Sequence, residues 1–191
     1  MDPDMALHKL KEGNKRFTEK MLKPKSEVCD RSGLIVGQQP YAAVITCSDS
    51  RVAPEIIFDT GFNEIFVIRN AGNVAAGIEI ASVEYALCHL NVPLVLVLGH
   101  EKCGAVKAAC CVFEDGECEG HFSHIYEKIR PSVEKYKNDD DRVTLVEYAN
   151  TRHTKQCLLD SDIVKKLVES GSVAIHCARY QIESGVVEFF E

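Results

Sequence analysis

Two short stretches of this 191-residue chain carry side chains that can bind a metal ion. Cys47 opens the first stretch, Cys-Ser-Asp-Ser-Arg, and the second, His-Glu-Lys-Cys-Gly, holds His100 and Cys103. Two thiolates and one imidazole suit Zn²⁺, which prefers tetrahedral sulfur and nitrogen ligands. Three protein ligands leave a fourth position open, which is typical of a catalytic zinc rather than a structural one. The residue types therefore predict a catalytic zinc centre.

Asp49 and Arg51 follow the first predicted ligand closely enough to act on such a centre. Asp49 can accept a hydrogen bond from a zinc-bound water, and Arg51 can hold that carboxylate ionised and oriented with its planar guanidinium. Asp49 also has a second option, because it can become the fourth ligand itself and displace the water. We therefore predict a catalytic dyad when Asp49 is free and a closed form when it is a ligand.

Each of these motifs has an ordinary explanation when it stands alone. A cysteine at a strand end is often a small buried residue, and a pair of ligands such as His-x-x-Cys is not yet a site. An Asp-x-Arg pair is usually a surface ion pair of small energetic value. The zinc prediction depends on all of them lying at strand ends of one domain.

Both stretches directly follow apolar runs that are typical of strands buried on both faces. Such runs occupy residues 42–46, 65–68, 93–98 and 173–175. Helical patterns lie between them, at residues 77–90, 104–113, 124–136, 144–158 and 160–170. The alternation predicts one α/β domain over residues 1–191, with a central, mostly parallel sheet flanked by helices. Ligands gather beyond the carboxyl ends of such strands, so the two stretches converge if their strands are neighbours.

Residues 1–40 precede the first predicted strand as a helical arm and a connector. Residues 4–22 show an amphipathic helical pattern that places Leu7, Leu10 and Phe17 near one face, and residues 23–39 form a polar stretch. An apolar face on such an arm would be exposed in a single chain. We therefore expect the arm to pack on a partner subunit.

Composition excludes several classes of protein. The chain is 46% apolar and 27% charged with a net charge of −7, and it shows no clustered basic face for nucleic acid. Its longest apolar run, residues 92–99, is far shorter than the roughly 20 residues of a membrane span. Gly99 and Gly104 have the spacing of a phosphate-binding loop, but Ala105 and Val106 stand where that motif needs lysine and a hydroxyl residue.

Cysteine usage indicates a reducing compartment. The nine cysteines are an odd number, so they cannot all be paired, and the first residues carry no apolar segment of a secretion signal. We therefore expect a cytoplasmic protein with free or metal-bound thiols. One further group, Cys118-x-x-His121-x-x-His124, has ligand-like spacing and leaves a second metal site open as an alternative.

The chain resembles the β-class carbonic anhydrases from about Leu7 to its C-terminus. The residues that carry this resemblance are Cys47-x-Asp49-Ser50-Arg51, Arg69-Asn70-Ala71-Gly72-Asn73, Val83-Glu84-Tyr85-Ala86, Gly99-His100-x-x-Cys103-Gly104-Ala105-Val106, Ala178-Arg179-Tyr180, Gly185-Val186-Val187 and Gly13-Asn14-Lys15-Arg16-Phe17. The resemblance implies reversible hydration of CO₂ to bicarbonate and a proton, by attack of zinc-bound hydroxide. Lys102 departs from the family pattern, because it stands between two ligands where small or acidic residues are usual.

The resemblance also assigns roles to individual residues. It makes Cys47, His100 and Cys103 the zinc ligands and Asp49 with Arg51 the dyad. The substrate pocket would be lined by Gln38, Phe66 and Tyr85, with the N–H of Gly104 and the side chain of Gln38 stabilising charge on the substrate oxygens. In the family these residues come from both subunits, so we expect a homodimer, or a tetramer formed by pairing of dimers.

Three alternatives remain open at this point. Cys47 could be a thiol nucleophile with His100 as its base, which would need no metal. The same scaffold could hydrolyse carbonyl sulfide or carbon disulfide, which are close relatives of CO₂. A zinc-bound dimer could also serve only as an interaction protein, although such a protein has no use for the Asp49–Arg51 pair.

Overall fold

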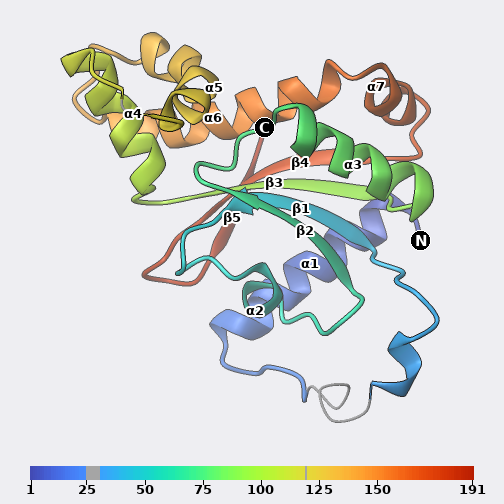
Figure 1. The fold of residues 1–191 in the computed structure, drawn as a ribbon. Coiled ribbons are helices and arrows are strands. Elements are labelled where there is room, and N and C mark those ends of the chain that lie inside the picture. Colours follow the sequence, from blue (N-terminus) through green and yellow to red (C-terminus); the bar gives the residue numbers. More distant parts are fainter. Residues whose placement is uncertain (25–30, 119) are drawn as a thin grey trace.

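A five-stranded sheet forms the centre of the computed structural model, which describes residues 1–24, 31–118 and 120–191. The strands follow the order β2-β1-β3-β4-β5 (Figure 1). Their bounds are β1 (Ala42–Cys47), β2 (Ile65–Asn70), β3 (Leu94–His100), β4 (Ala174–Tyr180) and β5 (Val187–Phe190). The first four are parallel, and only β5 runs antiparallel to its neighbour β4. The predicted α/β architecture with a mostly parallel sheet is confirmed.

Helices cover both faces of this sheet (Figure 1). On one face lie α1 (Pro3–Thr18) and α2 (Pro54–Ile57), and on the other lie α3 (Gly77–His89), α6 (Arg142–Leu159) and α7 (Asp162–Glu169). The remaining helices, α4 (Gly104–Asp115) and α5 (Phe122–Lys135), gather beyond the carboxyl ends of β1 and β3, and η2 (Ser32–Leu34) is a short 3₁₀ turn before β1.

The two central strands are buried along their whole length. Every residue of β1 and β3 is buried, which explains why both read as continuous apolar runs. Alternate side chains enter opposite layers, so Val44 and Leu96 pack toward α1 whereas Ile45 and Val97 pack toward α3 and α6. Apolar packing on both faces of the sheet thus holds the carboxyl ends of β1 and β3 next to each other.

Helix α1 packs on the sheet of its own chain. Ala6 and Leu10 have no exposed surface, and both belong to the same core cluster as Leu94 and Leu96 of the central strand β3. The sheet of the same chain therefore already covers this part of the apolar face, and packing of the arm on a partner subunit stays a prediction. The helix also ends at Thr18, earlier than the sequence pattern indicates.

The Gly13–Phe17 motif fastens α1 to the rest of the fold. A side chain at Gly13 would collide with the backbone of Phe58, since an added Cβ would lie 1.9 Å from the Phe58 carbonyl oxygen. The buried Asn14 side chain donates to the Gly185 carbonyl at 2.9 Å and accepts from the Val187 N–H at 2.9 Å. One helix position thus ties the N-terminus to strand β5.

Strand β5, helix α2 and the 3₁₀ turn η2 were not predicted from the sequence. Strand β5 is a four-residue edge strand with Glu188 exposed between apolar neighbours, so it forms no continuous apolar run. Helix α2 is a single turn, shorter than a helical period can reveal. For the part of the chain that the structure describes, no helix is both long and apolar enough to cross a bilayer.

Replacing Gly13 with alanine should destabilise the protein by about 1–3 kcal/mol, because the new methyl group overlaps backbone that cannot rotate away. Gly33→Ala is the matched control, since an added Cβ there meets nothing within 4 Å. Urea unfolding followed by circular dichroism measures both. Equal unfolding midpoints for the two variants would contradict this description of the α1 contact.

Candidate metal centre

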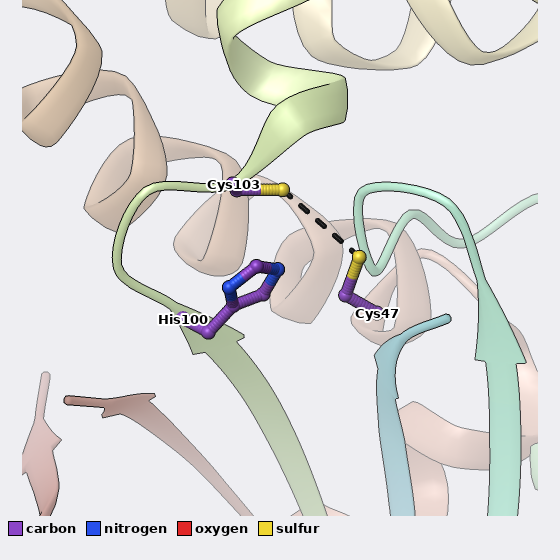
Figure 2. A group of neighbouring side chains, drawn as sticks. All are labelled: Cys47, His100 and Cys103. Atoms are coloured by element: carbon purple, nitrogen blue, oxygen red, sulfur yellow. Dashed lines mark hydrogen bonds between the residues drawn. The ribbon is translucent and has the colours of Figure 1, made fainter. Parts of the chain in front are cut away.

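Three side chains converge beyond the ends of β1 and β3. Cys47 is the last residue of β1, His100 is the last residue of β3, and Cys103 caps the start of α4. Because β1 and β3 are parallel neighbours with Thr46 opposite Leu98, Cys47 and His100 lie at the same edge of the sheet. Figure 2 shows the three side chains pointing toward one another.

The geometry of this group fits a tetrahedral zinc ion. The ligand atoms all lie within 4.8 Å of one another, and the three residues are at most 5% exposed. The sulfurs of Cys47 and Cys103 are 4.0 Å apart, close to the roughly 3.8 Å between two sulfurs that each lie about 2.3 Å from one tetrahedral ion. This donor set therefore matches the chemistry and the size that zinc requires.

His100 presents an unused nitrogen to the two sulfurs. Its Nδ1 lies 2.9 Å from the carbonyl oxygen of Glu101, which places the ring proton on Nδ1 and leaves a lone pair on Nε2. Nε2 is buried and has no hydrogen-bond partner among the described residues. A buried nitrogen without a partner is costly, and a metal ion would remove that cost.

A left-handed residue turns the chain between the second and third ligands. Lys102 has φ of 54°, and this conformation brings Cys103 back toward His100. The Lys102 side chain is exposed, and its carbonyl oxygen accepts a hydrogen bond of 3.3 Å from Arg51. The residue that departs from the family pattern therefore contributes backbone geometry to the site and directs its charge to solvent.

Hydrogen bonds favour a thiolate at Cys47. The bond shared with the Cys103 sulfur lowers the pKa of Cys47, and N–H groups of Gly72 and Asp49 lower it further. These N–H groups donate to the Cys47 sulfur at 3.3 Å and 3.4 Å. Since the thiolate is the form that binds a metal, the loops around Cys47 prepare it as a ligand.

Arg51 holds the Asp49 carboxylate with two parallel hydrogen bonds. Its Nε donates to Oδ1 at 2.9 Å and its Nη2 to Oδ2 at 2.7 Å, while the Arg51 N–H also donates to Oδ1. Oδ2 lies 4.0 Å from His100 Nε2, at the border of the three-ligand group but outside it. The Arg51 side chain holds the pKa of Asp49 well below its usual range. The carboxylate is thus ionised and lies beside the three-residue group.

Comparison with known proteins identifies the family. The carbonic anhydrase family model matches residues 42–187, which contain all three candidate ligands. Carbonic anhydrase 2 of Mycobacterium tuberculosis is 40% identical over 96% of this chain and 91% of its own length, and the carbonic anhydrase of Mycolicibacterium smegmatis is 37% identical over 98% and 93%. Among solved structures, the β-carbonic anhydrase CcaA superposes with a TM-score of 0.75 at 28% identity, over 97% of this chain and 95% of that one.

The chain belongs to the β-carbonic anhydrase family. The Coccomyxa β-carbonic anhydrase, solved with acetazolamide, agrees with this assignment at a TM-score of 0.75 and 26% identity, over 94% of this chain and 83% of that one. The resemblance found in the sequence is confirmed, and with it the assignment of this chain as a carbonic anhydrase.

The predicted pocket residues of this β-carbonic anhydrase do not gather at the metal ligands of their own chain. Gln38 is exposed before the start of β1, whereas Cys47 ends that strand. Phe66 pairs with Ala43, four residues before the level of Cys47, which corresponds to about 13 Å along the strand. Tyr85 of α3 lies beside Phe66, with ring centroids 6.1 Å apart. Only Gly104, the first residue of α4, adjoins a ligand directly.

The second metal site considered from the sequence is not supported. Among the described residues, Cys47, His100 and Cys103 form the one group with metal-ligand geometry, and Cys118, His121 and His124 do not join in another. The His121 and His124 rings are stacked with centroids 5.8 Å apart. Cys29, one of the other cysteines noted in the sequence, lies outside the described residues.

Sequence reasoning missed Glu147 as a residue of this site. Glu147 lies on α6, far from both motifs in the sequence, yet its Oε1 accepts a hydrogen bond of 3.0 Å from the backbone N–H of Cys103. Its side chain is only 2% exposed. The available signal was a glutamate among the apolar positions of a helical pattern. Because proteins rarely bury an unpaired charge, a glutamate in that position indicates a buried partner.

Replacing Arg51 with glutamine should raise the pKa of Asp49 toward the ordinary carboxyl value of about 3.9, because its main hydrogen-bonding cation is lost. The pKa is lower in the folded than in the unfolded chain, so this contact stabilises the fold above about pH 4 and its contribution is lost as the pH falls further. Carbon-13 NMR of the Asp49 carboxyl, after zinc removal with a chelator, measures the shift. Arg142→Gln, which breaks the exposed Arg142–Glu114 pair, is the control. Identical Asp49 titrations in all three proteins would refute the assignment.

Proposed function

We propose that this protein is a zinc-dependent carbonic anhydrase that reversibly hydrates CO₂ to bicarbonate and a proton. The observation that carries the proposal is the buried Cys47, His100 and Cys103 group, whose ligand atoms lie within 4.8 Å of one another. Membership of the β-carbonic anhydrase family supports the reaction. The thiol-nucleophile alternative loses support, because Cys47 and His100 share their position with a second thiol in metal-binding geometry.

The chain's own residues supply the ligands and the orientation of the reacting water. Zinc, when bound, provides a nucleophile at neutral pH by lowering the pKa of water. Asp49 borders the open side of the centre and can accept a hydrogen bond from water there, which fixes the direction of the water lone pair. Arg51 keeps this carboxylate ionised and engages both of its oxygens, which favours Asp49 as an acceptor beside the metal over Asp49 as a fourth ligand.

We further propose that the substrate pocket is completed by a second copy of the chain. Gln38, Phe66 and Tyr85 lie toward the amino-terminal ends of β1 and β2, away from the ligands of their own chain. Their proposed role beside CO₂ therefore requires a homodimer in which one copy supplies them to the centre of the other. Pairing of such dimers would give a tetramer, the state named for the Sordaria macrospora β-carbonic anhydrases, which are 22% identical with a TM-score of 0.78.

The cysteines are consistent with the proposed cytoplasmic location. All eight cysteines of the described part of the chain are unpaired, including the exposed Cys88 and Cys111. Exposed free thiols persist in a reducing compartment and are oxidised elsewhere. Together with the zinc ligands, which must stay reduced to bind metal, they favour the cytoplasm.

Purified protein should contain about one zinc ion per chain, and Cys47→Ser and Cys103→Ser should each lose it, since a thiolate ligand is removed. Asp49→Asn should keep the zinc and lose about 100-fold or more in CO₂ hydration rate, because the uncharged amide is a much weaker acceptor for the proton of the water than a carboxylate. Metal analysis and stopped-flow hydration assays measure the two quantities separately.

The same proteins assayed with carbonyl sulfide and carbon disulfide test the alternative substrates. Full activity without metal would overturn the proposal.

Mixed dimers test whether the pocket forms between two copies. Gln38→Ala and Asp49→Asn homodimers should both be poorly active, because each lacks one part of every site. After unfolding and refolding together, half of the dimers combine the two chains, and each mixed dimer should regain one intact site, about a quarter of the wild-type activity. A mixture no more active than its parents would show that Gln38 does not act across the interface. A fully active Gln38→Ala homodimer would remove Gln38 from the pocket altogether.

A further inference from the structure

Helix α6 directs a buried polar face toward the metal centre. Its members are Glu147, Asn150, Thr151 and Thr154, which are spaced so that they share one side of the helix. All four are at most 4% exposed, although this helix covers the sheet and would ordinarily bury apolar side chains. Each of the four side chains makes at least one hydrogen bond, so the partners show which segments this face of the helix supports.

Two of these partners lie in the loop that carries Cys103 and in the loop after β2, which contacts the Cys47 sulfur. Glu147 accepts from the N–H of Cys103 at 3.0 Å, and Asn150 donates to the carbonyl of Gly72 at 2.7 Å. Gly72 in turn donates its N–H to the Cys47 sulfur. One face of α6 therefore contacts the immediate supports of both cysteine ligands.

The helix approaches this closely because β3 has a glycine at the contact. A Cβ at Gly99 would lie 2.4 Å from the Thr151 hydroxyl oxygen, and Gly99 immediately precedes the ligand His100. The Thr151 hydroxyl donates to the Glu147 carbonyl and so stays within its own helix. Glycine at position 99 thus lets α6 lie against the end of the strand.

Arg179 of β4 holds the other side of the Glu147 carboxylate. Its Nε and Nη2 donate to Glu147 Oε2 at 3.1 Å and 2.8 Å, and the two side chains are 11% and 2% exposed. A charged pair this deeply buried brings little net stability, and loss of either partner leaves an unpaired charge. Arg179 pairs with Gly99 in the sheet register, so the ion pair joins α6 to the strands beside the ligands.

Both neighbours of the Glu147 side chain are donors, and this explains why the residue is a carboxylate. Oε1 accepts from Cys103 and Oε2 accepts from Arg179, so both oxygens must be acceptors. Glutamine would direct its NH₂ group against one of the two donors. A neutral side chain can therefore satisfy Cys103 only if the arginine is also removed.

We propose that Glu147 is a positioning residue of the metal centre, whose carboxylate, braced by Arg179, fixes the backbone of Cys103 and thereby the direction of its sulfur. Cys103 follows the left-handed Lys102 in a tight turn, so the Glu147 contact restrains the backbone at the end of that turn. Such support lets the metal bind without reordering its ligand. The inference rests on the proposed function only in that the bound metal is zinc.

Two double variants isolate this contact. Glu147→Gln with Arg179→Met removes the ion pair but keeps an amide oxygen to accept from Cys103, whereas Glu147→Met with Arg179→Met removes the pair and the acceptor together. Neither leaves a buried unpaired charge, so both avoid the unfolding expected of the single variants. Glu114→Gln, which breaks an ion pair of 2.7 Å on the surface, is the control.

The readouts are zinc transfer from the loaded protein to a chromogenic chelator and the thiolate-to-metal absorption of the cobalt-substituted protein. We expect the glutamine double variant and the control to hold zinc within about threefold of wild type. The methionine double variant should bind zinc about 10–100-fold more weakly and show a shifted cobalt spectrum. Equal zinc affinity in both double variants, whether unchanged or equally reduced, would overturn the proposal.

The result of the Glu147 experiment can be distinguished from the result that tests the proposed function. A wild-type protein that binds zinc but does not hydrate CO₂ would overturn the function and leave the Glu147 comparison valid. A wild-type protein that binds no zinc would overturn both. Circular dichroism of each variant confirms that its fold matches wild type before the affinities are compared.

Discussion

The parallel pairing of β1 with β3 is the constraint on which the site depends. Parallel neighbours end at the same edge of a sheet, so a cysteine that ends one strand and a histidine that ends the other must meet. Burial of both strands in two apolar layers fixes this pairing, because a slip by one residue would exchange the faces of every side chain. The third ligand then needs only a short turn, which Lys102 provides with its left-handed backbone.

Two carboxylates beside the centre are each held by an arginine, and their surroundings give them different tasks. Asp49 is partly exposed at the open side, where Arg51 keeps it ionised and available to water. Glu147 is buried, and Arg179 balances its charge. Its other oxygen accepts a hydrogen bond from the Cys103 backbone N–H. We propose that the first pair serves the reaction and that the second supports a metal ligand.

Local residue patterns were enough to predict four of the five strands and the three side chains that converge at the edge of the sheet. Continuous apolar runs identified four strands, and chemically specific side chains directly after two of them identified Cys47 and His100 as partners. Contacts between residues that are far apart in the sequence produce no local pattern of this kind, so they were not predicted. Glu147 reaches Cys103 across 44 residues, and the apolar face of α1 looked the same whether its own sheet or another chain was to cover it. The edge strand β5 was also missed, because its exposed Glu188 interrupts the apolar run.

X-ray absorption at the zinc edge of the purified protein tests the central claim most directly, since it counts the atoms bound to the metal. Convergence of Cys47, His100 and Cys103 on one ion predicts two sulfur atoms at about 2.3 Å and two lighter atoms, from the imidazole and water, at about 2.0–2.1 Å. The signature of an imidazole ring should accompany one of the lighter atoms. A set of zinc-bound atoms that contains no sulfur, or only one sulfur, would contradict the account.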